Sequence, residues 1–419
     1  MFNHNILSMP AKHGLKLTSL LRNSVSYLFF AFLMNIVSCA IAQKPVSSVA
    51  GATDVPHFTV EEATDWTNLF HRERGWFGGD GIFFIPMDGK RNQHHSRSVD
   101  QLVLFSDSMI GDAVLGRTQG NNKMVHNAVA ILNGSAPKEE KIKFYWDSTS
   151  NGTPETMFIP STPSAIPNDY YWLGDGLFNY LTGETYIFGY KMFNVESTND
   201  WSFTLTKTNL IILPKGSKPP FANQKQIETP FSFINAADGD NGSFGSAIFV
   251  STKKAGLSNY DNYVYVYGIK GKQKKLLVAR VTMEQFLDFG KWTFWNGSSW
   301  TSNMLDAAPI CDGVSDEMSV SQRKDGKYVM IFQRGGLSPK IGMRIGDTPY
   351  GPFRDVIDIY TCPIGATNKN QFAYNAKAHP SISRDGELII SYNVNAFDFD
   401  NELLKEPQLY RPRFIRLKW

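Results

Sequence analysis

The chain has 419 residues, of which 42% are hydrophobic and 19% charged, with 30 Phe, 17 Tyr and 34 Gly. This composition excludes disorder, coiled coil and collagen-like repeats, and it is typical of a turn-rich β protein. The formal charge of +3 comes from residues 1–42, so that the remainder balances 39 basic against 39 acidic residues. A neutral body lacks the basic surface that binding to nucleic acid or to an anionic membrane requires.

Residues 1–42 are predicted to be an export signal. An uncharged apolar block at 27–33 follows a basic stretch, and it is too short for a membrane span of about 20 residues. Two processing sites compete: cleavage after Ala42 would release a soluble protein, whereas a lipobox ending at Cys39 would attach a lipid anchor. We expect a linker at 43–57 and an exported protein that is periplasmic, secreted or an outer-membrane lipoprotein.

Only two cysteines, Cys311 and Cys362, follow the signal. An even pair in an oxidising compartment permits one disulfide, but two separate buried thiols fit equally well. Their spacing does not resemble a zinc site.

A short strand after a Gly- or Ser-containing turn recurs five times. Its first aliphatic residues are separated by roughly 60–95 positions, as propeller blades require, and are Ile82, Leu177, Ile248, Val320 and Ile382. The last copy is expected to span 378–382. A second, more apolar strand follows each copy, at 102–106, 185–189, 263–267, 328–332 and 388–392. Third strands are expected at 128–132, 276–281, 341–345 and 414–417.

Repeats of three or four antiparallel strands predict the blades of a propeller. We therefore expect an all-β fold in which residues 58–419 form a single five-bladed β-propeller. Residues 58–70 are expected to add an outer strand that closes the ring with the carboxy-terminal blade. A β-sandwich or two β domains is the alternative, but neither requires every repeat to start alike. Helical periodicity is nearly absent, apart from a short turn or helix at 283–289.

Two aspartates are predicted to meet at one rim of the central channel. The end of an antiparallel second strand lies beside the beginning of the first. Asp80 begins the first strand of blade one and Asp107 ends its second strand. The same argument brings groups from other blades into this funnel: Asp175, Glu317 and His379, with His126 on the same face but further from the axis.

A ring of carboxylates provides what carbohydrate hydrolysis needs. One protonated carboxyl gives its proton to the leaving oxygen, and a second, ionised one attacks the sugar or activates water. Crowding several carboxylates in a partly closed pocket raises one pKa while another group stays ionised. Trp76 and Trp172 could supply flat faces for sugar rings.

Each of these residues also has a structural interpretation. An Asp between glycines often only forms a turn, Glu317 could pair with Lys377, and His379 could be a buried hydrogen-bonded histidine. The convergence of several acids on one rim favours the functional interpretation. No metal motif, phosphate loop or Gly-x-Ser-x-Gly elbow occurs, so no metal ligand or cofactor is predicted, although calcium in the channel stays open.

Five stretches together resemble glycoside hydrolase family 183, and they lie at 75–81, 104–112, 172–176, 317–320 and 374–380. The resemblance implies a five-bladed β-propeller and an endo-D-arabinanase that cuts α-1,5-linked D-arabinofuranose chains of mycobacterial arabinogalactan and lipoarabinomannan. It implies that Asp80 and Asp107 are the catalytic pair. Asn375 and Lys377, which lie in the last of these stretches, are expected to contact the substrate. A polar insertion at 90–99 departs from the family pattern.

Two alternatives remain: a non-catalytic glycan-binding propeller, or a glycosidase acting on another furanose polymer. The surroundings of Asp107 discriminate, because a carboxylate bonded to several main-chain N–H groups has a depressed pKa and cannot act as an acid. A carboxyl separation near 5 Å would favour retention and a wider gap inversion. The expected partner is a polysaccharide, the expected membrane contact is a lipid on Cys39, and the protein is expected to be a monomer.

Overall fold

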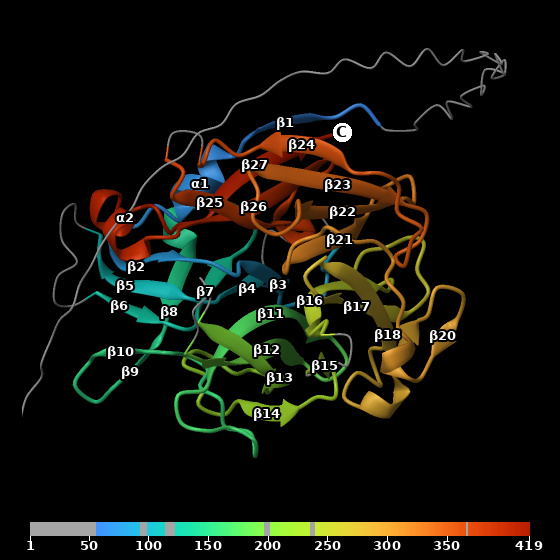
Figure 1. The fold of residues 1–419 in the computed structure, drawn as a ribbon, viewed down its shortest axis with the longest axis horizontal. Helices are drawn as coiled ribbons and strands as arrows, with labels where there is room; N and C mark the ends of the chain where they lie inside the picture. Colours follow the sequence, from blue (N-terminus) through green and yellow to red (C-terminus); the bar gives the residue numbers. More distant parts are fainter. Residues whose placement is uncertain (1–55, 93–98, 114–121, 197–201, 235–238, 366–367) are drawn as a thin grey trace, which may run out of the picture. The chain divides into compact units, whose positions relative to one another are not determined.

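A computed structural model describes residues 56–92, 99–113, 122–196, 202–234, 239–365 and 368–419. The chain separates into two units, Met1–Val55 and Pro56–Trp419. The predicted signal at 1–42 with its Cys39, and nearly all of the linker, therefore lie outside the described residues. The regular elements of Pro56–Trp419 are almost all strands, which confirms the all-β prediction (Figure 1). None of the helices described is long and apolar enough to cross a bilayer.

Within the described ranges, five antiparallel sheets have four or more strands (Figure 1). The first contains β3 (Phe83–Pro86), β4 (Asp100–Phe105), β7 (Ala128–Asn133) and β8 (Ile142–Tyr145). The second contains β11 (Tyr170–Asn179), β12 (Glu184–Asn194), β13 (Phe203–Leu213) and β14 (Lys225–Glu228). The third contains β15 (Ser232–Phe233), β16 (Gly242–Ser251), β17 (Tyr263–Lys270), β18 (Lys275–Thr282), β19 (Thr293–Trp295) and β20 (Trp300–Thr301).

The fourth sheet contains β21 (Met318–Gln322), β22 (Tyr328–Gln333), β23 (Lys340–Gly346) and β24 (Ile357–Thr361). The fifth contains β25 (Gln371–Ala378), β26 (Glu387–Ala396), β27 (Arg413–Lys418) and β1 (Thr59–Glu62). A smaller, three-stranded sheet contains β2 (Arg74–Gly79), β5 (Ser108–Asp112) and β6 (Lys123–Val125). A two-stranded sheet pairs β9 (Asp147–Ser148) with β10 (Pro154–Glu155). The short helices are α1 (Thr64–Leu69) and α2 (Phe399–Lys405).

The central strands are mostly apolar because both of their faces are covered. Every residue of β22 is buried, for example, as expected for a strand packed between two layers. Five core clusters join consecutive sheets, and the last joins the fifth sheet back to the first. Each cluster contains residues from two of the five larger sheets; examples from the five clusters are Leu104 and Ile187, Phe188 and Val266, Tyr265 and Met330, Ile331 and Ile390, and Ile389 and Val103.

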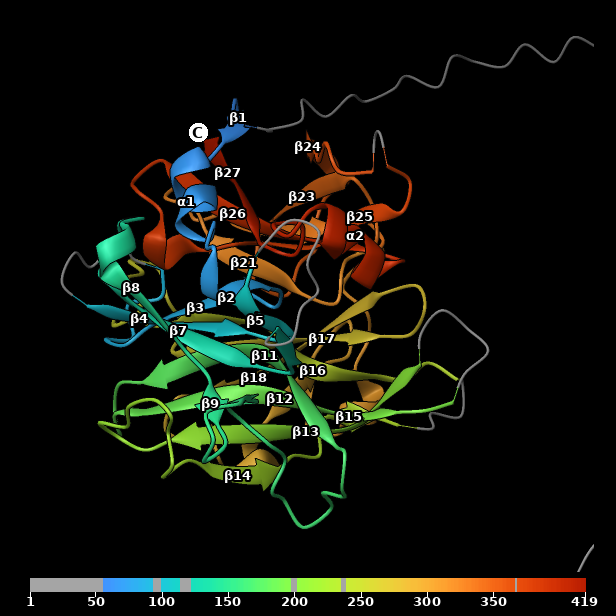
Figure 2. The same cartoon turned by 90° about the vertical axis from the view of Figure 1, so that its left-hand side faces the viewer.

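The amino-terminal strand completes the carboxy-terminal sheet, as predicted for residues 58–70. β1 pairs antiparallel with β27, with Thr59 opposite Lys418, and the two strands lie side by side near the carboxy terminus (Figure 2). α1 then packs its Trp66 against Phe414, the ring centroids being 6.1 Å apart. The two ends of this unit are thereby held in one sheet.

Some predictions on secondary structure were wrong. The fifth opening strand ends at Ala378 rather than spanning 378–382, because Pro380 cannot donate to a ladder and begins a 3-10 turn. The helices α1 and α2 were not predicted, since six or seven residues are too few to show a helical period. The predicted turn at 283–289 is present and leads into a 3-10 helix, Phe289–Lys291. Both Cys311 and Cys362 are free thiols.

Candidate active site

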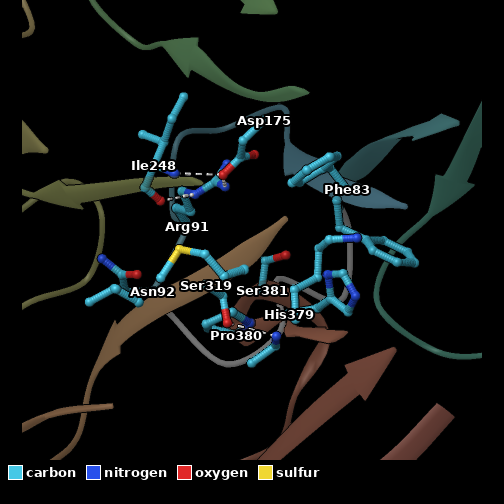
Figure 3. A pocket seen from close by; sticks show the side chains of 14 residues that line it. Phe83, Arg91, Asn92, Asp175, Ile248, Ser319, His379, Pro380 and Ser381 are labelled. Carbon is cyan, nitrogen blue, oxygen red and sulfur yellow. Dashed lines mark hydrogen bonds and ion pairs between the residues drawn. The ribbon is translucent and has the colours of Figure 1, made fainter. Parts of the chain in front are cut away.

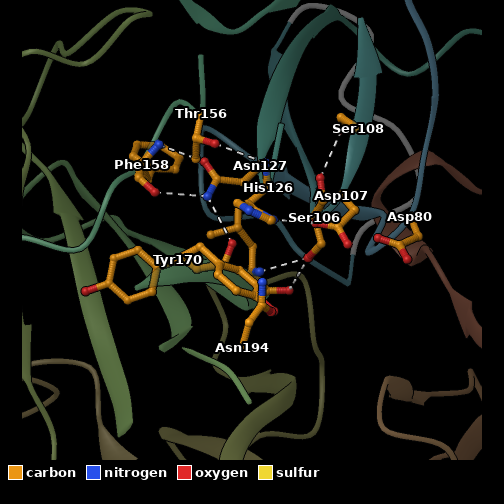
Figure 4. A network of polar contacts seen from close by, with 12 residues as sticks. Asp80, Ser106, Asp107, Ser108, His126, Asn127, Thr156, Phe158, Tyr170 and Asn194 are labelled. Atoms are coloured by element: carbon orange, nitrogen blue, oxygen red, sulfur yellow. Dashed lines mark hydrogen bonds and ion pairs between the residues drawn. The ribbon is translucent and has the colours of Figure 1, made fainter. Parts of the chain in front are cut away.

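Asp80 and Asp107 lie side by side, each in a gap between two strands (Figure 4). Asp80 separates β2 from β3, and Asp107 separates β4 from β5. The backbone N–H of Asp80 donates to the Asp107 carbonyl at 3.1 Å, and the N–H of Ser106 donates to the Asp80 carbonyl at 2.8 Å. Two successive residues thus face one, the pattern of a β-bulge, which re-aims side chains next to a site.

The glycine after Asp80 makes this approach feasible. Gly81 has a φ of +64°, in the left-handed region that glycine adopts without cost. A Cβ atom at this position would lie 2.6 Å from Ser106 Oγ. The Gly-Asp-Gly sequence therefore reflects a close contact between two chain segments as well as a turn.

Both aspartates line a pocket with a volume of about 710 Å³. Glu317, Asn375 and Trp172 line it too, as predicted. The other lining residues are mostly aromatic, aliphatic or small, and they include Tyr190, Phe203, Leu205, Leu337, Phe372, Tyr374 and Tyr410. Four acidic residues, Asp80, Asp107, Asp316 and Glu317, therefore line one cavity.

The surroundings of Asp80 favour its protonated, neutral form. Burial, followed by the negative charge of Asp107, raises the pKa of Asp80 to about 8, against the opposing hydrogen bond from Tyr374. The Tyr374 hydroxyl donates to Asp80 Oδ2 at 2.6 Å, and the Tyr410 hydroxyl is a second partner. Within the described residues, no Lys or Arg forms an ion pair with Asp80. A carboxyl in these surroundings is mostly protonated at neutral pH.

Asp107 is held by a side chain rather than by the main chain. Its Oδ1 lies 3.0 Å from His126 Nδ1, and the His126 ring stacks on Tyr170 with centroids 3.9 Å apart (Figure 4). Among the described residues, no backbone N–H donates to the Asp107 carboxylate. The main-chain capture that would have favoured a non-catalytic site is therefore not seen there.

Glu317 combines both interpretations that the sequence allowed. Its carboxylate forms an ion pair with the buried Lys377 and accepts a hydrogen bond from Asn375 Nδ2 at 2.9 Å. Burial raises the pKa of Glu317, and the Lys377 charge opposes that effect. Glu317 is thus a paired structural acid whose surface still contributes to the pocket.

Asp175 belongs to a different, much smaller cavity of about 20 Å³, contrary to the prediction (Figure 3). Its Oδ1 accepts from the N–H of Gly176 at 2.8 Å, and its Oδ2 accepts from that of Ile248 at 2.7 Å. The same Oδ2 forms an ion pair with Arg91, which comes from the polar insertion at 90–99. The insertion, of which 93–98 lie outside the described residues, therefore supplies the cation that pairs with Asp175.

His379 also lines the small cavity rather than the predicted funnel. Its Nε2 lies 2.7 Å from Ser391 Oγ, and its ring packs edge-on against Phe84 with centroids 4.9 Å apart. Burial, reinforced by the charges of Lys377 and Arg91, holds the pKa of His379 well below its usual range. It is a neutral, buried histidine.

Of the two candidate tryptophans, Trp76 lies in the core and Trp172 lines the pocket. Trp76 is only 1% exposed, stacks on Phe144 at 4.7 Å and donates from Nε1 to Ser108 Oγ at 3.2 Å. It is a core residue and offers no face to a sugar, so that part of the prediction was wrong. Trp172 does line the pocket and meets Phe203 edge-on at 4.5 Å.

The residues that decide these roles, Arg91, Tyr374 and Tyr410, were not predicted from the sequence. Arg91 gave no signal, because a lone basic residue in a polar insertion usually faces water. Tyr374 lies in one of the stretches of family resemblance, but its bond to Asp80 joins positions 294 residues apart. Tyr410 offered no motif at all. No group of three His, Cys, Asp or Glu in the described ranges is placed to hold a metal ion.

The comparisons with known proteins give one family and a set of distant folds. A family described as a domain of unknown function (DUF5005) matches residues 63–419. A proposed hydrolase from Bacteroides ovatus ATCC 8483 aligns with a TM-score of 0.65 and 21% identity, over 86% of this chain and 90% of its own. That likeness shows a shared fold. The comparison with curated proteins gives no match.

Two carbohydrate-active enzymes are more distant in structure. The exo-β-1,3-galactanase from Phanerochaete chrysosporium aligns at a TM-score of 0.40 and 11% identity, over 81% of this chain and 60% of its own. The α-L-arabinofuranosidase from Podospora anserina aligns at 0.40 and 10% identity, over 82% and 91%.

Proposed function

Since the chain belongs to the DUF5005 family, whose description states no activity, we propose a function from the chemistry of the pocket: the protein is a glycoside hydrolase. The observation that carries the proposal is the adjacent pair Asp80 and Asp107, in which the pKa of Asp80 is raised to about 8. A protonated carboxyl beside a second carboxylate in a largely apolar pocket is the arrangement that glycosidic cleavage uses.

Asp80 is the acid in this mechanism. It donates its proton to the glycosidic oxygen as the bond from that oxygen to the anomeric carbon breaks. A water molecule supplies the hydroxyl that the anomeric carbon gains. If Asp107 acts directly as base, it takes the proton of that water; if Asp107 first bonds to the anomeric carbon, the ionised Asp80 takes the proton as water displaces the Asp107 carboxylate. His126 and Tyr170 orient the Asp107 carboxylate for this step.

The proposed substrate is an α-1,5-linked D-arabinofuranose chain, cut internally. The resemblance to glycoside hydrolase family 183 supports this choice, and so does the pocket: its one lining Lys or Arg among the described residues, Lys274, is paired with Asp316 at 2.7 Å. Several acidic groups, together with a lining Lys that is already paired, favour a neutral polysaccharide over a uronate or phosphate polymer.

The remaining expectations belong to the same proposal. The five larger sheets would be the blades of a β-propeller, which the five core clusters between consecutive sheets support. Export through the segment 1–42, followed by release or by lipidation of Cys39, would bring the enzyme to an extracellular polymer.

The test is product analysis with purified protein. We expect oligosaccharides from mycobacterial arabinogalactan and none from plant L-arabinan or fructan. Asp80→Asn and Asp107→Asn should each lower turnover by about 10³-fold or more, as loss of a catalytic acid or base does. Asp347→Asn, in an exposed ion pair with Lys327, is the matched control and should cleave normally. Undiminished turnover in either pocket variant would overturn the assignment.

A further inference from the structure

The pocket has an apolar rim on the side of the fifth sheet. Phe397 follows β26, is 60% exposed, and its ring centroid lies 4.8 Å from that of Phe372 in β25. Phe372 lines the pocket, and so does Leu337, which is 45% exposed and whose backbone forms a bridge to Tyr374. The three side chains Phe397, Phe372 and Leu337 are called the outer rim below.

The outer rim continues inward to the proposed acid. The ring centroids of Phe372 and Tyr374 are 5.6 Å apart, and the Tyr374 hydroxyl donates to Asp80 at 2.6 Å. The exposed end is fixed, because the Phe397 N–H donates to the Asn370 carbonyl at 2.9 Å. Exposed apolar side chains that are contiguous with a pocket mark binding surfaces, and a backbone already fixed loses little entropy when a ligand binds.

A second aromatic wall flanks the carboxylate pair from another sheet. Trp172 in β11 and Phe203 in β13 both line the pocket. The strands β3 and β4 adjoin the carboxylate pair, and their sheet packs against the second sheet on one face and the fifth on the other. Aromatic surface therefore stands on both sides of Asp80 and Asp107.

We propose that the outer rim is a subsite that holds a sugar unit of a neutral polysaccharide beyond the units joined at the cleaved bond. The proposal rests on the proposed glycosidase function and deepens it. Sugar rings expose an apolar C–H face, and covering that face with an aromatic ring removes apolar surface from water. With aromatic walls on both sides of the carboxylates, the polymer runs across the pocket and is cut within its length.

The test compares a polymer with a truncated substrate, using the full chain. Phe397→Ala, and Phe397→Ala with Phe372→Ala, should raise KM for arabinogalactan roughly ten- to a hundred-fold, as loss of a buried aromatic contact does. kcat/KM of the Phe397→Ala variant for a p-nitrophenyl arabinofuranoside should stay within twofold, because this small substrate does not reach Phe397. Phe397→Trp should restore the polymer KM. Leu305→Ala, at an apolar side chain that is 75% exposed and outside the pocket lining, is the matched control.

A binding measurement distinguishes failure of the subsite proposal from failure of the proposed hydrolase function. Migration of the protein through gels containing arabinogalactan should be retarded, and the Phe397→Ala variant should lose that retardation. If the wild type cleaves or binds the polymer and Phe397→Ala behaves identically, the outer rim is not a subsite. If the wild type binds without cleaving, the hydrolase assignment falls and the subsite is judged by retardation alone. A wild type that neither binds nor cleaves contradicts both.

Discussion

The tripeptide Gly-Asp-Gly occurs twice around the candidate site, and its two copies have opposite surroundings. Asp80 lines a large pocket, where burial, followed by the negative charge of Asp107, raises its pKa to about 8. Asp175 lies in a small cavity, where two backbone N–H groups and Arg91 hold its carboxylate. The same residues thus build a reactive acid in one place and a fixed ionic link in the other.

The difference lies in what compensates the charge. A buried carboxylate with a cation and amide donors is stable as an ion, whereas one facing a second carboxylate prefers its neutral form. Asp175 therefore helps to link neighbouring sheets, whereas the ionised form of Asp80 is energetically unfavourable. Such uncompensated groups are found at functional sites.

The largest loss of stability is expected from a variant in the small cavity. Lys377→Met leaves Glu317 as a buried acid without its cation, so the free energy of unfolding should fall by about 3–5 kcal/mol. Urea unfolding followed by circular dichroism measures it. Lys324→Ala breaks an ion pair whose two side chains are 73% and 72% exposed, and it should change the same quantity by less than about 1 kcal/mol. Equal effects of the two variants would show that Lys377 does not compensate a buried charge.

The two Gly-Asp-Gly aspartates should respond to amidation with opposite signs. Asp175→Asn leaves Arg91 without its ion-pair partner and should destabilise the protein by about 1–3 kcal/mol. Asp80→Asn removes a group that is unfavourable when ionised and should stabilise the protein at pH 8 by several kcal/mol, since the folded and unfolded pKa values differ by about four units. Thermal unfolding of both variants beside the wild type gives the signs, and a loss of stability at pH 8 in Asp80→Asn would refute the contrast.

The stability difference between Asp80→Asn and the wild type should depend on pH, and the sign of that dependence follows from the pKa shift of Asp80. Its folded pKa of about 8 exceeds the unfolded value near 3.9, so between these values the folded state binds more protons. Wild-type stability attributable to Asp80 is therefore complete below about pH 4 and declines as the pH rises to about 8. The stability gap between Asp80→Asn and the wild type should vanish near pH 4 and be largest at pH 8. A gap of constant size would mean that Asp80 does not titrate there.

The smallest effect within the neutral range is on turnover. Since the acid must be protonated, kcat/KM should change little up to pH 7 and fall about tenfold per pH unit above about 8. A pH profile on the polymer measures it. The folded Asp175→Asn variant should show the same dependence of kcat/KM on pH. A shift in the pH at which its kcat/KM falls would show that Asp175 takes part in the reaction.

Much of the fold could be predicted because its signals are local. The alternation and apolar runs located ten or more strands to within a few residues, and the closing strand at β1 was inferred from its place before the first repeat. The meeting of Asp80 and Asp107 followed from antiparallel geometry alone. The same geometry misplaced Asp175, because it ignores where Arg91 comes from.

What could not be predicted depends on contacts between distant segments. Arg91 reaches Asp175 from an insertion with no pattern of its own. Tyr374 and Tyr410 approach Asp80 only because the fifth sheet packs against the first. Trp76 looked like a surface platform, since a sequence does not show that Phe144 covers its face.

The ionisation of Asp80 can be measured directly, and it carries the whole mechanistic account. Carboxyl-¹³C aspartate resonances of the wild type and of Asp80→Asn would be followed by NMR from pH 4 to pH 9.5. We predict a resonance that titrates with a midpoint near 8, is missing from Asp80→Asn, and parallels the loss of polysaccharide cleavage at high pH. If the resonance lost in Asp80→Asn titrates below pH 5 instead, Asp80 is an ordinary carboxylate and cannot be the proton donor.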